Sequence, residues 1–295
     1  MYAYSFLQKA ADQMIPDGAG LTIGVLFRAF RLRICLTWML TLTETTLTAL
    51  IPLFIGFAID GLLSGTKVAL FHLAAIMAVL IIVAVTRRVY DTRVFGSVRV
   101  ALGKAQASRG AELPVSSLNA RLNMGRELVG FLEEDLPITM TSILQLIVSV
   151  GVLYYFHPVL ALASLVALAT ILSIYTVFHR LFFRLNGRLN HQTEQQVKIL
   201  QKRAPSRIVQ HLLRIRKVEV QISDSESILY GVIYVILLSL IIFNLWIATS
   251  SLQITSGTIF SIVTYSWEFI DASLALPMAL QNWSRLSEIT QRIVK

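Results

Sequence analysis

Apolar residues are concentrated in six runs, each long enough to cross a lipid bilayer. A spanning helix needs about 20 predominantly apolar residues. Acidic or basic side chains occur within only two of these runs, the first and the last. The pattern predicts six transmembrane helices, over residues 34–59, 68–86, 138–156, 159–178, 228–249 and 258–281.

Short and long connections alternate between the runs. Residues 60–67, 157–158 and 250–257 form the short connections, whereas residues 87–137 and 179–227 form the long ones. Apolar side chains continue at helical spacing into both long connections. We therefore expect the second and fourth spans to extend as helices well outside the membrane.

Helix-breaking residues in each long connection predict a short helix at its tip. In the first connection, Pro114 ends the incoming helix and Gly125 interrupts the chain before the next span. In the second, Pro205 ends the incoming helix, a short helix capped by its serine covers 206–213, and the return helix begins near Arg214. The predicted fold is all-α and polytopic.

The N-terminal segment, residues 1–33, is predicted to be separate from one six-helix domain over residues 34–295. Apolar groups alternate with Arg28, Arg31 and Arg33 toward its end. This spacing is typical of an amphipathic helix in the membrane interface, with its cations among lipid head groups. A frayed tail is the alternative.

Composition favours a membrane protein over a soluble domain. Hydrophobic residues make up 55% of the chain, charged residues 15%, and the mean hydropathy is +0.68. A soluble fold would leave much of this apolar surface in water. The single cysteine, Cys35, excludes an internal disulfide, and the five histidines show no metal-ligand spacing, so we predict no metal site.

The positive charge is distributed unevenly along the chain. Of the 26 lysines and arginines, only Lys67 lies in a short connection. The positive-inside rule then places both termini and both long connections in the cytoplasm, which suits a bacterial inner (plasma) membrane. Anionic lipid accounts for the net charge of +9, and nucleic acid is not an expected partner because no aromatic-and-basic motif accompanies it.

With these spans and connections, the chain resembles the transmembrane domain of ATP-binding-cassette (ABC) exporters of the six-helix type. The resemblance covers about residues 21–293 and is carried by residues 52–60, 113–135, 252–257, and 277 with 286–293. It implies long intracellular helices, two coupling helices, and a dimer made with a second copy or with another transmembrane domain.

The sequence departs from that family by lacking the motifs of a nucleotide-binding domain. A phosphate loop needs a glycine-rich run that ends in lysine and a hydroxyl residue. The Gly103-Lys104 pair is followed by Ala105 and has Val98 in the place of the first glycine. We expect no catalytic residue and no cofactor in this chain, with ATP bound by a partner subunit.

The resemblance leaves two functions open. The chain could be the membrane-spanning subunit of an exporter, forming the translocation pathway while a separate chain hydrolyses ATP. Alternatively, it could be an ATPase-free transmembrane binding or regulatory module, or the partner of another transporter half. The residues expected to couple to an ATPase partner are Val115, Ser116, Leu118, Asn119, Arg121, Ser206, Arg207 and His211.

Charged and polar side chains inside the spans are candidates for a substrate cavity. Glu268 and Asp271 are three residues apart and share one helix face, and Glu44 is expected near mid-depth of the first span. In the resembled fold, the first and sixth helices border the central cavity. Carboxylates in hydrocarbon mark functional sites by default, so we expect cationic or amphipathic substrates. Asn244 is a further candidate, hydrogen bonding between helices is the alternative, and Asp60 is expected to face the outer water.

Overall fold

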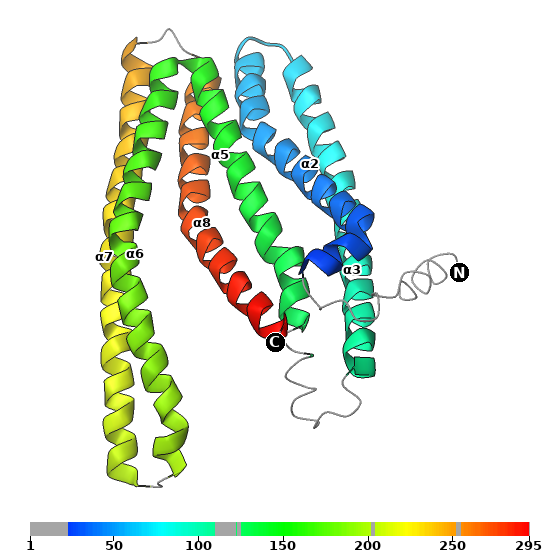
Figure 1. Cartoon of the computed structure of the whole chain (residues 1–295). Helices are drawn as coiled ribbons and strands as arrows, with labels where there is room; N and C mark the ends of the chain where they lie inside the picture. The colour runs from blue at the N-terminus through cyan, green and yellow to red at the C-terminus, as the bar shows by residue number, and fades with distance from the viewer. Residues whose placement is uncertain (1–22, 110–121, 123–124, 202–203, 252–254, 295) are drawn as a thin grey trace. The chain divides into compact units, whose positions relative to one another are not determined.

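The computed structural model describes residues 23–109, 122, 125–201, 204–251 and 255–294. The chain divides into two compact units, residues 1–153 with 253–295 and residues 154–252. Every regular element in the described part is a helix (Figure 1).

Six helices are long and apolar enough to cross a membrane, as the sequence pattern predicts. Their bounds are α2 Ile23–Leu63, α3 Val68–Arg109, α5 Leu136–Phe156, α6 Pro158–Gln201, α7 Pro205–Ser251 and α8 Ser256–Val294 (Figure 1). Each predicted span lies within one of these helices. The predicted all-α polytopic fold is therefore confirmed.

In the first unit, α2 and α3 form an antiparallel hairpin closed by a predicted short connection. Gly65 has a φ of +80°, a left-handed conformation that glycine adopts without steric cost. The N–H of Thr66 donates to the carbonyl of Gly61 at 2.8 Å, and the N–H of Gly65 donates to that of Leu62 at 3.1 Å. The chain thus reverses within a few residues, and α3 runs back along α2.

Helix α3 is 42 residues long and continues past the end of its apolar run, as predicted. The part from Arg87 to Arg109 adds about 33 Å at 1.5 Å per residue. This extension shares a buried core with the start of α2 and with the segment that precedes α5. The core residues are Leu26, Phe30, Ile34, Val94, Phe95, Val98, Ala101, Leu102, Leu128, Val129, Phe131 and Leu132.

The start of α2 is bent at Phe30, whose φ and ψ of −117° and 16° are not helical. Leu26 and Phe30 are buried in the core shared with α3, whereas Arg28 and Arg31 are exposed. Protein therefore covers part of the apolar face that the sequence pattern would give to lipid. The position of the arginines among lipid head groups stays a prediction.

A single π-helical turn, η1 (Phe131–Asp135), connects the helical residues 125–130 to α5. The N–H of Leu136 donates to the carbonyl of Phe131 and closes this wider turn. A π turn shifts the helical register by one residue. Phe131 and Leu132 consequently both reach the core, where they are 6% and 1% exposed.

The second unit contains the antiparallel hairpin of α6 and α7. Buried residues recur every three or four positions along both helices, which is the spacing of a helix that buries one face. Within the predicted spans they are Leu160, Ala161, Ser164, Ala167 and Ile171 on α6, and Leu229, Ile233, Leu237, Leu240, Asn244 and Ala248 on α7.

The tip of the α6–α7 hairpin differs from the prediction. Helix α7 begins at Pro205 and is continuous, so the structure contains no separate short helix over 206–213 and no new helix start at Arg214. The N–H of Ile208 donates to the carbonyl of Ala204 at 3.1 Å and starts the helical ladder. Proline is well suited to a first helical position because its missing N–H would have no partner there.

Candidate functional site

Glu44 on α2 forms an ion pair with Arg87 on α3. The Nε of Arg87 donates to Oε2 of Glu44, and its Nη2 donates to Oε1 at 3.3 Å. The Nη1 of Arg87 also donates to Oδ2 of Asp91, one turn further along α3, at 2.9 Å. One guanidinium therefore binds two carboxylates, and the charge of Glu44 is neutralised by its neighbour.

The register of the α2–α3 hairpin explains this pairing. Glu44 precedes the end of α2 at Leu63 by 19 residues, and Arg87 follows the start of α3 at Val68 by the same number. That rise is about 29 Å, close to the roughly 30 Å thickness of a bilayer core. Glu44 and Arg87 therefore lie at the same level of the hairpin, and the expected mid-depth position of Glu44 stays a prediction.

Glu268 on α8 accepts a hydrogen bond from Nε2 of Gln145 on α5 at 2.5 Å. Glu268 is half-buried, and Asp271, one turn away, is exposed. Among the described residues, neither carboxylate has a basic group within 4.0 Å. Unlike Glu44, these two carboxyl groups form no ion pair among the described residues, so a ligand could meet them.

Two hydrogen bonds join α8 to α2 in antiparallel register. The hydroxyl of Tyr265, fully buried, donates to the carbonyl of Ala49 at 2.5 Å, and Oγ of Ser261 donates to the carbonyl of Pro52 at 3.1 Å. Measured along the helix axes from the contact between Tyr265 and Ala49, the levels of Glu268 and Glu44 differ by about 3 Å. The structure thus brings the carboxylates of α2 and α8 to one level.

At the other end of α2, Asp60 holds the start of α8. Its Oδ1 accepts from the N–H of Gly257 at 2.8 Å, and its Oδ2 accepts from Oγ1 of Thr255 at 2.5 Å. The N–H of Thr258 in turn donates to Oγ1 of Thr255 at 3.2 Å. Asp60 thus satisfies groups at a helix N-terminus, where a carboxylate is favourable. That this end of α2 faces the outer water stays a prediction.

Close approach of two glycines sets the distance between α2 and α8 beside this carboxylate. A Cβ atom on Gly257 would lie 2.0 Å from the carbonyl oxygen of Gly56 and 2.7 Å from the carboxylate of Asp60. A Cβ atom on Gly56 would lie 2.6 Å from the carbonyl oxygen of Gly257. Small residues allow such approach between membrane helices, and here only glycine fits at position 257.

Asn244 belongs to the second unit and lies on the buried face of α7. It is 1% exposed, and α7 packs against α6 along that face. Its burial between two paired helices favours the alternative reading of a structural polar residue over a ligand contact. Glu44, Glu268 and Asp271 belong to the first unit, and Asn244 belongs to the second.

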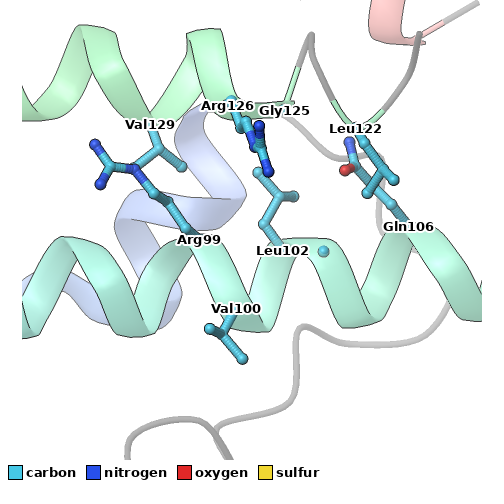
Figure 2. A pocket seen from close by; sticks show the side chains of 9 residues that line it. Arg99, Val100, Leu102, Gln106, Leu122, Gly125, Arg126 and Val129 are labelled. Atoms are coloured by element: carbon cyan, nitrogen blue, oxygen red, sulfur yellow. The ribbon is translucent and has the colours of Figure 1, made fainter. Parts of the chain in front are cut away.

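A hollow lies between α3 and the helical residues 125–130, outside the predicted spans (Figure 2). Its volume is about 550 Å³, and Arg99 and Arg126 line it from the two sides. Arg99 is paired with Glu133 of η1. The amide of Gln106 lies against Gly125, where a Cβ atom would be 2.6 Å from its nitrogen. This hollow is basic and carries no predicted site residue.

The residues expected to couple to an ATPase partner are only partly described. Pro114 and the five candidates between 115 and 121 lie outside the described residues. Ser206 and Arg207 are exposed on the first turn of α7, whereas His211 is 3% exposed. The ring of His211 is thus covered while α6 and α7 stay paired.

In chemical terms, the first unit offers carboxylates and an amide at one level. Glu268, Asp271 and Gln145 could bind a cation or a hydrogen-bond donor, and Glu44 is already paired. No group of three or more histidine, cysteine or acidic side chains that could hold a metal ion occurs in the described part of the chain.

Comparison with known proteins identifies the family. The family model described as ABC transporter transmembrane region matches residues 24–257, which include the first five spans and the start of α8. No nucleotide-binding domain family is found in the chain. No curated protein matches the chain. Because the match covers well over half of the sequence, the chain belongs to the ABC transporter transmembrane region family.

Proposed function

We propose that this chain is the membrane-spanning subunit of an ABC-type exporter and forms its substrate translocation pathway, while a separate chain hydrolyses ATP. The family match carries the proposal. Six membrane-length helices whose extensions reach far beyond the apolar runs support it, because such extensions could transmit movement from an ATPase to the membrane.

We further propose that the extensions face the cytoplasm of a bacterial inner membrane and that two transmembrane domains pair. Basic residues at the ends of α3 and α6 support this orientation. Exposed apolar side chains on both hairpins support pairing as well as lipid contact; examples are Ile82, Val85, Val177, Val235 and Ile242. The second domain would be another copy or a different chain.

An ATPase partner can be tested directly. The tagged chain is purified from its native membranes in mild detergent, and co-purified proteins with a phosphate loop are identified by mass spectrometry. We expect one such ATPase at a stoichiometric ratio, and ATP hydrolysis that rises after both are reconstituted in lipid. Loss of the partner from Arg207→Glu would support contact at the start of α7, where the side chain is exposed.

The opposite outcome would favour the second function. A chain that purifies without an ATPase from native membranes, and that binds ligand without ATP, would be an ATPase-free binding or regulatory module. Co-purification of another complete transporter half would instead identify the chain as that half's partner.

For the substrate, we propose cationic or amphipathic molecules that meet Glu268 and Asp271. Binding of a panel of lipophilic cations is expected to weaken about tenfold or more in Glu268→Gln/Asp271→Asn, because a hydrogen bond to a charged group contributes roughly 1.5–3 kcal/mol. Glu44→Gln should change binding by less than about threefold, since Arg87 already neutralises Glu44. Unchanged affinity in the folded double variant would refute this substrate class.

A further inference from the structure

A hollow on α6 lies at the end of the apolar run of that helix. It has a volume of about 630 Å³ and is lined by His179, Arg180, Phe183 and Arg184. The apolar run from Val159 to Phe178 rises about 29 Å, close to the thickness of a bilayer core. The hollow therefore lies at a membrane face, at the depth of lipid phosphate groups.

The arginines of this hollow form no ion pair with any side chain among the described residues. Arg180 and Arg184 are exposed and one helical turn apart, and Arg188 continues the row by another turn. Among the described residues, none of the three has a carboxylate within 4.0 Å, although Asp224 lies near the same level on α7. Arg184 instead donates from Nε to the carbonyl of Arg180 at 3.3 Å.

One large apolar side chain lines the same hollow, and another is exposed on α6 toward the apolar run. Phe183 lines it and is 74% exposed, and Val177, on the membrane side of the arginines, is 73% exposed. A soluble anion would need only the cationic groups. An anionic phospholipid suits both kinds of group at a membrane face, because its head group can contact the cations and its acyl chains can contact the exposed apolar side chains.

We propose that this hollow binds an anionic phospholipid, with its phosphate on Arg180 and Arg184 and its acyl chains beside Phe183 and Val177. His179 adds a further donor to the head group. The site requires only that the chain crosses a membrane, so it does not depend on an ATPase partner or on a transported substrate. It would fix the depth of α6 at this face.

Native mass spectrometry of the full chain in detergent tests the site. Phosphatidylglycerol and phosphatidylcholine are titrated separately, and retained lipid is counted. We expect tighter retention of phosphatidylglycerol and an affinity about 25-fold lower in Arg180→Gln/Arg184→Gln, since each basic residue contributes about fivefold near an anionic lipid. The single variant Arg184→Gln should lose about fivefold and guards against a folding defect in the double variant.

A matched control removes the same charge elsewhere. Arg214→Gln/Arg216→Gln alters two exposed arginines on α7, about 18–21 Å along the helix from its apolar run, and should stay within about twofold of the unmodified chain. Equal loss in both double variants, or no loss in Arg180→Gln/Arg184→Gln, would overturn the proposal. Glycerol phosphate should not displace the lipid at equal concentration; if it does, the ligand is a soluble anion.

Discussion

Arg87 links the charges of α2 and α3 because it donates to both Glu44 and Asp91. Without its guanidinium, two carboxylates would remain close together with no cation between them. We expect Arg87→Gln to lower the free energy of unfolding in mixed micelles by about 2 kcal/mol. This is less than the 3–5 kcal/mol for a fully buried pair, since these side chains are about a quarter exposed.

The neighbouring Arg88 provides the control for this prediction. Arg88 is exposed and forms no ion pair within the described residues, so Arg88→Gln should change stability by less than about 0.5 kcal/mol. Glu44→Gln/Arg87→Gln should be more stable than Arg87→Gln alone, because one of the uncompensated carboxylates is removed. Equal effects of Arg87→Gln and Arg88→Gln would contradict the ionic cluster.

Gly257 offers a second test at the level of single residues. Gly257→Ala places a Cβ atom 2.0 Å from a backbone oxygen of α2, which a side-chain rotation cannot relieve. We expect a loss of about 3 kcal/mol or more in unfolding free energy as α2 and α8 separate. Gly96→Ala meets nothing within 4 Å and should stabilise α3 by about 0.5–1 kcal/mol. Equal stability of the two variants would show that the glycine contact is absent.

Among the elements, α7 departs most from the expected arrangement. The structure contains one continuous helix from Pro205, where the sequence pattern suggested a short helix followed by a new one. Coupling through such a helix would be rigid from its tip into the membrane. Its first turn would then move together with the buried face that contacts α6.

Distance measurements between spin labels test the continuity of α7. Positions 207 and 220 are both exposed, and their backbones should be about 20 Å apart along an unbroken helix. Positions 230 and 243 have the same spacing within the predicted span and provide the reference. A clearly shorter or broader distribution for the first pair would indicate a break near residue 213.

For the whole molecule, the proposed orientation makes a prediction about labelling from outside. In a background with Cys35→Ser, single cysteines at positions 65 and 157 should react with a membrane-impermeant thiol reagent in intact cells. A cysteine at position 205 should react only after the cells are opened, because the proposed topology places the tip of α7 in the cytoplasm. Labelling of position 205 in intact cells would reverse the orientation.

Features that depend on composition and periodicity followed from the sequence alone. Six apolar runs of bilayer length predicted the six helices, because a helix satisfies its own backbone groups and hydrocarbon offers no other partner. The short connection at Gly65 and the long extension of α3 were likewise predicted. The family resemblance also came from the sequence and was confirmed by the family match over residues 24–257.

Tertiary structure decided which side chains meet. The pairing of Glu44 with Arg87, the role of Asp60 at the start of α8 and the hydrogen bond from Gln145 to Glu268 each join residues at least 40 positions apart. Hydropathy records the environment of each residue but not its neighbour on another helix. Helix register and the close approach at Gly257 determine those neighbours, and so decided which carboxylates pair with a basic side chain.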